Sequence, residues 1–473
     1  MINSLKECRG ISNSLCSIIS SVLSKIKPDN KEREYILSFV ERIIREIKNA
    51  LSDLEFPFRV EVHGSIAHDT WLKNDRDIDI FILLQKELSK NFVEENILKR
   101  IEKRLPYTFE RRYAEHPYLR TRINEFEIDI VPGFDVGKII SAVDRTPFHT
   151  EFLMKNLTQE LKDEVRLLKV FLKGIGAYGA EIKIGGFSGY ACELLIVYFK
   201  SFLKTVNAFA KQKRIFIDFT NSWKEKKAFQ EFNTPIIIID PVDKKRNVTA
   251  SITFKTFDKI KLASKIFLER PSIEFFYPAK KSIDMNQLEE KTKKRAVMLI
   301  LLKKEENISP DTYWGQIRRT EQKIVNFLKK FPELEVFAVE SFENENNVMI
   351  CIETNKLELS NYIEIKGPPV WANTGHILEF INKHKEGIEA GPWIKNGRIV
   401  YLRERRDEEK RLARFLEQFM QKLRLNPSFK HFIVIDEPQK ILECVKNQKL
   451  ENELMDFLVR RYPWLTIKDD LKK

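Results

Sequence analysis

A chain of 473 residues is too long for one compact hydrophobic core, so its length predicts two to four domains. The 82 basic residues outnumber the 69 acidic ones, and the net charge of +13 favours a polyanionic partner. The longest uninterrupted apolar run, residues 296–302, is far too short to cross a membrane, and the N-terminus lacks the solid apolar core of a secretion signal. We therefore expect a soluble, cytoplasmic protein without a membrane partner.

The cysteines are odd in number and include no Cys-x-x-Cys pair. They are Cys8, Cys16, Cys192, Cys351 and Cys444. This pattern argues against a disulfide framework and a zinc site, and it favours a reducing compartment. We expect all five side chains to be small buried apolar groups.

The first 150 residues predict an α/β head. Two helices are expected before residue 51, divided at Lys27-Pro28-Asp29, and the second has apolar residues at helical spacing. Strand-like segments follow at residues 58–64, 77–84 and 126–136.

Two of these strand-like segments carry acids in apolar surroundings. Asp77 and Asp79 project to one face of a strand, and Glu127 and Asp129 do the same on another. Three carboxylates converging at one sheet edge (Asp77, Asp79 and Asp129) suit two hard cations such as Mg²⁺. Such cations activate an attacking hydroxyl and stabilise leaving pyrophosphate. Glu127 is expected to be a solvated strand acid.

A Gly64-Ser65 turn precedes the first acids by about a dozen residues. At the start of a helix it would offer backbone N–H groups and a hydroxyl to phosphate oxygens. The competing interpretation is that the acids merely end two strands at a solvated edge. The turn and the third acid together favour a nucleotidyl-transfer site.

Residues 151–200 are strongly helical. By composition alone, Lys169 beside Arg166 and Lys173 indicates a solvated helix face. Six glycines then fall within residues 174–189 and include a literal GxGxxG. A helix precedes it, whereas the dinucleotide fingerprint requires a strand, so we expect a close helix crossing or a backbone approach to a ligand.

Residues 235–252 predict a short strand that enters a Pro-Asp turn. Beyond about residue 265, apolar strand-like segments alternate with basic helices, which indicates a second α/β region. The expected strands are 295–305, 334–343, 347–354 and 398–404, and the expected helices are 313–331 and 408–425. The strand content after residue 330 leaves room for a tail-to-tail homodimer.

One of these helices begins with an aromatic and basic cluster. Tyr313, Trp314, Arg318 and Arg319 have a composition that suits RNA contact by base stacking and phosphate binding. The competing interpretation is an amphipathic helix whose aromatic residues lie in the core and whose arginines are solvated. We favour RNA contact.

Several motifs together resemble the archaeal, class I CCA-adding enzymes (tRNA nucleotidyltransferases). They are GSIAHDTWL, DIDIF, DIVPGFDV, SAVDRTPFH, VRLLKVFLKGIGAYGAE, GGFSGY, DPVDKKRNV, YWGQIRR and GPPVW. The first motifs are shared with poly(A) polymerases and the wider DNA polymerase β-like superfamily. The later ones are more specific, and the similarity spans nearly the whole chain.

The resemblance implies an α+β multidomain fold. Its parts are a polymerase β-like nucleotidyltransferase head with a mixed sheet (1–150), a helical neck for base recognition (151–265), and an α/β body and tail that binds tRNA (266–473). It also implies Mg²⁺-dependent, template-independent addition of C, C and A to tRNA 3′ ends from CTP and ATP.

The resemblance also assigns residues. Asp77, Asp79 and Asp129 fall on the metal-binding carboxylates of the family. The expected nucleotide-binding residues are Ser65, His68, His149, Lys169, Tyr178 and Arg246. Arg246 matches an arginine that reads the incoming base, and His68 stands where the family usually has an arginine that contacts phosphate. A histidine is only partly charged near neutral pH.

Two other functions are compatible with parts of the chain. A poly(A) polymerase or other terminal RNA nucleotidyltransferase would share the head, but it should lack the DPVDKKRNV and GPPVW similarity. A non-catalytic RNA-binding protein of the same fold is expected to have lost one of the three acids, and all three are present.

Overall fold

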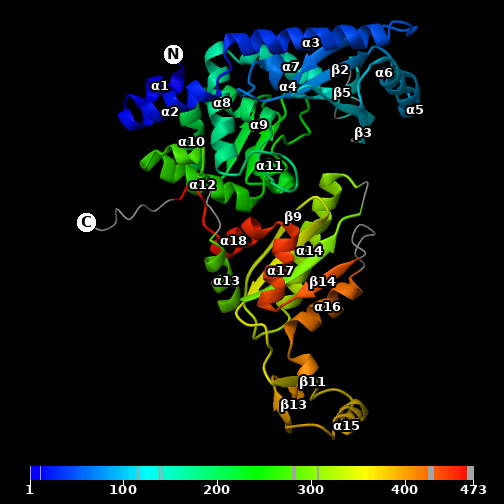
Figure 1. Ribbon diagram of the computed structural model, residues 1–473. Coiled ribbons are helices and arrows are strands. Elements are labelled where there is room, and N and C mark those ends of the chain that lie inside the picture. The colour runs from blue at the N-terminus through cyan, green and yellow to red at the C-terminus, as the bar shows by residue number, and fades with distance from the viewer. Residues whose placement is uncertain are drawn as a thin grey trace. The chain divides into compact units, whose positions relative to one another are not determined.

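The computed structural model describes residues 2–10, 12–113, 117–137, 139, 141, 143–279, 284–305, 308–423 and 431–465. The chain forms two compact units, the first Met1–Lys280 with Tyr462–Lys473 and the second Lys281–Arg461 (Figure 1). Both combine helices with β-sheet, so the fold is α+β and multidomain. Within the described ranges no helix is both long and apolar enough to span a bilayer.

Three helices open the first unit: α1 (Asn3–Cys8), α2 (Asn13–Ile26) and α3 (Asn30–Ala50). The expected break at Lys27-Pro28-Asp29 is confirmed, and the Asp29 side chain caps α3 by accepting from the backbone N–H of Glu32. The segment before that break is two helices rather than one.

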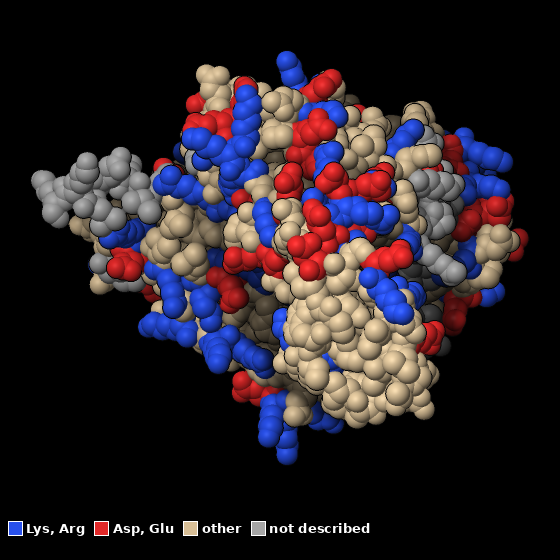
Figure 2. Space-filling model, turned by 90° about the horizontal axis from the view of Figure 1, so that it is seen from below, with Lys and Arg blue, Asp and Glu red and all other residues tan. Residues whose placement is uncertain are grey.

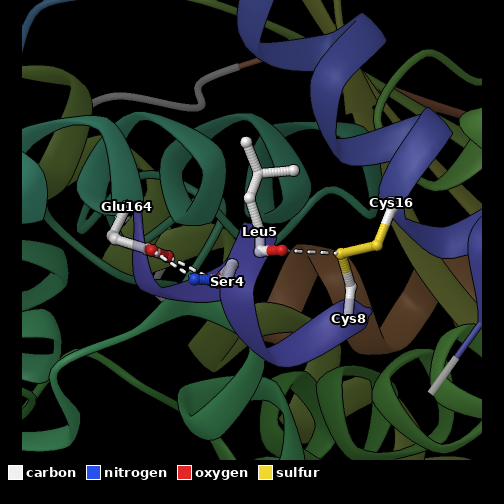
Figure 3. Close-up of a disulfide and its surroundings, with 5 residues drawn as sticks. All are labelled: Ser4, Leu5, Cys8, Cys16 and Glu164. Atoms are coloured by element: carbon white, nitrogen blue, oxygen red, sulfur yellow. Dashed lines mark hydrogen bonds between the residues drawn. A yellow bond between two sulfur atoms is a disulfide. The ribbon is translucent and has the colours of Figure 1, made fainter. Parts of the chain in front are cut away.

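Cys8 and Cys16 form a disulfide between α1 and α2, with their Cα atoms 5.4 Å apart (Figure 3). The expectation of no disulfide was therefore wrong. The total number of cysteines says nothing about two residues eight positions apart that a helical hairpin brings together. Of the other three, Cys192 and Cys351 are buried and Cys444 is half-buried, all as free thiols.

The head sheet has five strands in the order β1-β2-β5-β4-β3. Their bounds are β1 Phe58–His63, β2 Asp77–Leu84, β3 Phe109–Tyr113, β4 Pro117–Ile123 and β5 Phe126–Phe134. The three expected strands are confirmed, and β3 and β4 complete the sheet. The apolar side of α3 packs on this sheet, where Ile36, Ile43 and Ile47 share a core with the strand residues (Figure 1). Short helices connect the strands: α4 Gly64–His68, α5 Lys90–Phe92, the π-helix η1 Val93–Leu98 and α6 Lys99–Arg104.

A largely helical part of the same unit follows. It contains α7 Arg145–Asn156, α8 Gln159–Gly174, α9 Gly189–Phe199, α10 Phe202–Lys211, β6 Ile215–Asp218, α11 Glu225–Phe232, β7 Ile236–Ile239, α12 Phe254–Glu269 and the 3₁₀ turn η2 Ile273–Phe275. The glycine-rich segment joins α8 to α9 and makes close contacts with backbone atoms. A Cβ at Gly174 would collide with the carbonyl oxygen of Phe275, and one at Gly186 with that of Ala177.

The second unit contains two antiparallel sheets, ordered β14-β8-β10-β9 and β11-β13-β12. The strands are β8 Ala296–Lys303, β9 Val336–Glu343, β10 Asn347–Thr354, β11 Tyr362–Pro369, β12 Ala390–Lys395, β13 Arg398–Glu404 and β14 Phe432–Ile435. The helices are α13 Met285–Lys294, α14 Pro310–Leu328, α15 Thr374–Lys383, the 3₁₀ turn η3 Asp407–Glu409, α16 Leu412–Lys422, α17 Pro438–Gln448 and α18 Glu451–Val459. All four strands expected here are present, as are both helices. The last two residues expected in the second helix, 424–425, lie outside the described residues.

Candidate active site

The two acid-bearing strands lie side by side in the head sheet. β2 and β5 run parallel, and their register pairs Asp77 with Glu127 and Asp79 with Asp129. Because alternate residues of a strand share a face, Asp77, Asp79 and Asp129 emerge on one side of the sheet. Glu127 is exposed, as expected for a solvated strand acid.

The three acids form a negative cluster with a partial internal counter-charge. Burial, followed by the nearby charges of Asp129 and Asp77, raises the pKa of the Asp79 carboxyl to about 6. Asp129 accepts hydrogen bonds from Nε and Nη2 of Arg120, both at 2.7 Å, because β4 places that arginine opposite it. Among the described residues, no group of three or more His, Cys, Asp or Glu side chains is already arranged to hold a metal ion.

The Gly64-Ser65 turn lies directly beside this cluster. β1 ends at His63, and α4 begins at Gly64, whose φ of 66° favours glycine. A Cβ there would collide with the carboxylate of Asp79, so a larger residue would displace that acid. Ser65 therefore occupies the first turn of a helix next to Asp79, one of the expected metal ligands.

A cavity of about 450 Å³ opens over these residues. Of the expected site residues, it is lined by Ser65, His68, Asp77, Asp79, His149, Lys169 and Tyr178. Asp129 and Arg246 are not among its lining residues. Residues from strand β2, from α4, α7 and α8 and from the glycine-rich segment thus share one cavity.

Lys169 is buried in the wall of this cavity. The composition-based interpretation of a solvated helix face was wrong, because α8 packs against the segment that follows α4. Lys169 Nζ donates to the backbone oxygen of Thr70 at 3.0 Å, and Arg166 Nε donates to that of Trp71 at 2.8 Å.

Tyr178 lies beside another lysine of the same helix. Lys173, one turn beyond Lys169, lies over the Tyr178 ring at 5.2 Å. Burial raises the pKa of the Tyr178 phenol, which therefore stays protonated as a hydrogen-bond donor.

The wall of the cavity also contains a stacked pair of rings held by one buried acid. The rings of His149 and Tyr190 stack with centroids 4.0 Å apart. Asp240, which is fully buried, bonds His149 Nε2 at 2.9 Å and accepts from Arg246 Nη1 at 2.7 Å. Arg246 is thus joined to the cavity wall through one shared carboxylate. Burial acts to raise the pKa of Asp240, but His149 and Arg246 outweigh burial and lower it.

The aromatic residues expected to contact RNA lie in the second unit and are buried. Tyr313 is 6% exposed and Trp314 is 3% exposed, and both belong to the core between α14 and the β8-β10 sheet. Neither ring is available for base stacking, so that part of the expectation was wrong and the amphipathic-helix interpretation holds. Arg318 and Arg319 are exposed on α14, and Arg318 also pairs with Glu321 at 3.0 Å.

Four residues of the site were not expected from the sequence: Tyr190, Glu193, Asp240 and Arg120. Tyr190 and Asp240 stand inside GGFSGY and DPVDKKRNV, so the motifs pointed to their neighbourhood without assigning their contacts. Glu193 lies in an otherwise apolar helix, α9, and an acid in such a setting is itself a signal of a buried polar network. No sequence pattern pointed to Arg120, because the strand that carries it, β4, was not predicted.

Comparisons with known proteins cover most of the chain. A nucleotidyltransferase domain matches residues 44–157, the second domain of tRNA nucleotidyltransferase matches 163–277, and the C-terminal domain of CCA-adding enzyme matches 294–423. A curated CCA-adding enzyme from Saccharolobus islandicus is 41% identical over 397 residues, which are 82% of this chain and 89% of that protein. The CCA-adding enzyme of Sulfolobus acidocaldarius is 35% identical over 461 residues, 95% of this chain and 99% of that one.

Among solved structures, a cytoplasmic RNA terminal U-transferase is similar to 56% of this chain over 98% of its own, with 16% identity and a TM-score of 0.44. That likeness is too weak to support an argument. The similarity to the curated sequence relatives does support an argument, because it extends over four-fifths or more of both chains. On that ground, this chain belongs to the CCA-adding enzyme family.

Proposed function

We propose that this protein adds C, C and A to the 3′ end of tRNA, using CTP and ATP without a template and releasing pyrophosphate. The observation that carries the proposal is the 450 Å³ cavity in which Asp77 and Asp79 face Ser65, Lys169 and Tyr178. It joins acids suited to cations with donors suited to a triphosphate. Full-length relatives named CCA-adding enzymes support the choice of reaction.

The reaction is the attack of an RNA 3′-hydroxyl on the α-phosphorus of a bound nucleotide. The new P–O bond forms as the bond to pyrophosphate breaks, and no covalent enzyme intermediate is needed. Ser65, Lys169 and Tyr178 would hold the triphosphate in line with the attacking oxygen. Catalysis of this kind rests on orientation and on fixed charges.

The chemistry of the acid cluster suits a hard divalent cation, and we propose Mg²⁺. The residues that would hold it are Asp77, Asp79 and Asp129, whose mutual repulsion is the cause of the raised pKa of Asp79 after burial. A bound cation relieves that repulsion and supplies charge for the hydroxyl and the leaving group. Glu127 is left in solvent.

Base choice must come from a pocket of hydrogen-bonding groups, since no template strand is involved. Tyr190 offers a ring face beside the cavity, and Asp240 fixes the His149 ring and the Arg246 guanidinium, whose remaining polar atoms can meet a base. A site with fixed polar groups rejects a base that leaves them unpaired. We therefore propose that Arg246, His149 and Asp240 act together in selecting C and A.

A terminal RNA nucleotidyltransferase such as a poly(A) polymerase is the second candidate, and the shared head favours it. The match of residues 294–423 to the C-terminal domain of CCA-adding enzyme weighs against it.

We propose three functional parts along the chain: a head (1–150), a neck (151–265), and a body with tail (266–473).

The test uses tRNA that lacks its CCA end, incubated with each labelled NTP singly and then with CTP and ATP together. We expect two C residues from CTP alone and three additions, C, C and A, from the mixture. A long homopolymer from one NTP would favour the second candidate, and no addition by the wild-type protein would reject both.

We propose that the second unit contributes to tRNA binding through exposed basic residues, among them Arg318 and Arg319. Contacts to phosphates and 2′-hydroxyls suit an enzyme that must accept every tRNA, because A-form RNA exposes little sequence in its narrow major groove. Figure 2 shows a face of the molecule on which lysine and arginine are interspersed with aspartate and glutamate. Binding by many separate contacts is consistent with that distribution.

We also propose a homodimer in the cytoplasm. β12 is the edge strand of its sheet and is exposed along its whole length. Trp371 and Ile394 are 77% and 68% exposed in the same small sheet region. Unpaired strand edges and exposed apolar side chains favour association between chains. Sedimentation velocity tests this, and a monomer at micromolar concentration would reject it.

A further inference from the structure

A buried carboxylate stands at the wall of the nucleotide cavity. Glu193, on α9, is 3% exposed and lines the cavity together with Lys169. An acid in a pocket for a polyphosphate is unfavourable by itself, because like charges repel. Its presence therefore calls for a specific partner.

Glu193 has two partners on the segment that begins at α4. The Thr70 hydroxyl donates to Oε1 at 2.5 Å, and His68 Nδ1 lies 3.1 and 3.2 Å from the two carboxylate oxygens. Thr70 in turn accepts from Lys169 Nζ through its backbone oxygen at 3.0 Å and its hydroxyl oxygen at 3.2 Å. A chain of contacts thus runs from Glu193 through Thr70 to Lys169.

This series of contacts fixes the direction in which each donor points. Because the Thr70 hydroxyl proton is committed to Glu193, its oxygen presents lone pairs to Lys169. An ammonium has three N–H donors, and Thr70 accounts for two of them. One donor of Lys169 remains for a phosphate oxygen in the cavity that it lines.

His68 is committed to the same network at both ring nitrogens. Nδ1 faces Glu193, and Nε2 lies 3.1 Å from the Thr150 hydroxyl oxygen on α7. This ring therefore joins α4 to α7 and α9, instead of presenting a nitrogen to phosphate. It does not reproduce the phosphate contact expected from the arginine that the family usually has at this position.

We propose that Glu193 is a positioning residue for the nucleotide triphosphate, acting on Lys169 through Thr70 and braced by His68. The inference rests on the proposed function, since the triphosphate is its ligand. A buried ammonium without compensation is costly, and the Glu193 charge offsets that cost without occupying the donor needed by phosphate. Burial acts to raise the pKa of Glu193, but His68 and Lys169 outweigh it and keep the carboxyl ionised.

The test compares Glu193→Gln with Glu164→Gln, a matched control. Glu164 is also a fully buried acid of the first unit, but it accepts from Ser4 and from the Phe202 backbone N–H and does not line the cavity. For both variants we would measure the KM for CTP, kcat, the CTP dissociation constant by calorimetry with Mg²⁺ present, the tRNA dissociation constant and the Tm.

We expect Glu193→Gln to raise the KM and the dissociation constant for CTP about tenfold or more, with unchanged tRNA affinity and a smaller effect on kcat. Glu164→Gln should lower the Tm and leave CTP binding unchanged. If both variants lose Tm equally and bind CTP as tightly as the wild-type protein does, Glu193 is only a structural acid. That result would overturn the inference.

A second pair keeps the test decisive if Glu193→Gln does not fold. Thr70→Val removes the hydroxyl at nearly constant shape, and Thr70→Ser restores it. Weak CTP binding in the valine variant, with rescue in the serine variant, supports the relay, and equal binding in both contradicts it. If the wild-type protein binds CTP but adds nothing to tRNA, the proposed function is wrong. The inference about Glu193 can still be tested in that case, because it depends on the comparison of CTP affinities.

Discussion

At the scale of single residues, the acid cluster has the properties of a site that needs a cation. Asp79 is held among Asp77, Asp129 and low-dielectric surroundings, so its folded pKa of about 6 lies above the ordinary value of 3.8. A folded state that binds its proton more tightly than the unfolded state loses stability as pH rises. Without metal, this loss develops between about pH 4 and pH 6 and persists above that window.

Asp79→Ala should therefore abolish nucleotide addition without unfolding the protein. We expect activity to fall by roughly a hundredfold or more. In EDTA at pH 7.5 the variant should be at least as stable as the wild type, and added Mg²⁺ should raise the Tm of the wild type only. Glu127→Ala, an exposed acid of the same edge, is the control and should remain active. Wild-type activity in Asp79→Ala would refute the assignment.

Arg246→Ala tests base selection. Because Asp240 fixes this guanidinium next to His149, we expect its loss to blur discrimination of CTP and ATP from UTP and GTP more than it slows correct addition. Competition between labelled nucleotides on tRNA measures the ratio, and Lys245→Ala, the exposed neighbour, provides the control. An equal loss on all four nucleotides would instead place Arg246 on phosphates or in the fold.

At the scale of elements, the N-terminal hairpin is held by a covalent link that closes a short loop. A disulfide mainly restricts the unfolded chain, and for a separation of eight residues the stabilisation is about 2–3 kcal/mol. α1 also contributes Ser4 to the buried Glu164 network, so a loosened hairpin would disturb α8.

We expect the double variant Cys8→Ser, Cys16→Ser to melt at a lower temperature than the wild type under oxidising conditions. A reducing agent should bring the wild type to the same Tm and leave the double variant unchanged. Cys444→Ser, which removes a half-buried free thiol, should melt as the wild type does. Identical melting of the wild type with and without the reducing agent would argue that the link contributes nothing to stability.

At the scale of the whole molecule, the charge of +13 predicts that tRNA binding depends strongly on salt. Each neutralised phosphate releases counterions, so the logarithm of affinity should fall linearly with the logarithm of salt concentration. CTP binding, which we propose involves the first unit alone, should be much less sensitive.

Replacing residues 284–461 by a flexible linker tests where that affinity resides. This design keeps Trp464, whose ring stacks on Phe275 of the first unit at 5.5 Å, and so preserves a core contact that a simple truncation would remove. We expect CTP binding to persist while tRNA affinity falls by orders of magnitude. Equal tRNA affinity and salt slope in the shortened chain would show that the second unit is not the main binding surface.

The features that the sequence by itself determined are those governed by local periodicity. Asp77 and Asp79 are two residues apart in an apolar strand, so their common face follows from strand geometry alone. The Gly64 turn and the break before α3 follow from residues with restricted or permissive backbones. The motifs that identify the family are local strings as well, and they are the basis for predicting Lys169, Tyr178 and Arg246 as site residues.

Only the tertiary structure decided which neighbours those residues meet. Helical spacing cannot tell that α8 packs its lysine against Thr70, or that α14 buries Tyr313 and Trp314 beneath its solvated arginines. The pairing of Arg120 with Asp129 needs β4 in register beside β5, and the link between Glu193 and Lys169 needs two helices and a loop to meet. Such contacts join positions far apart in the chain, and they depend on how whole elements pack, which no local pattern encodes.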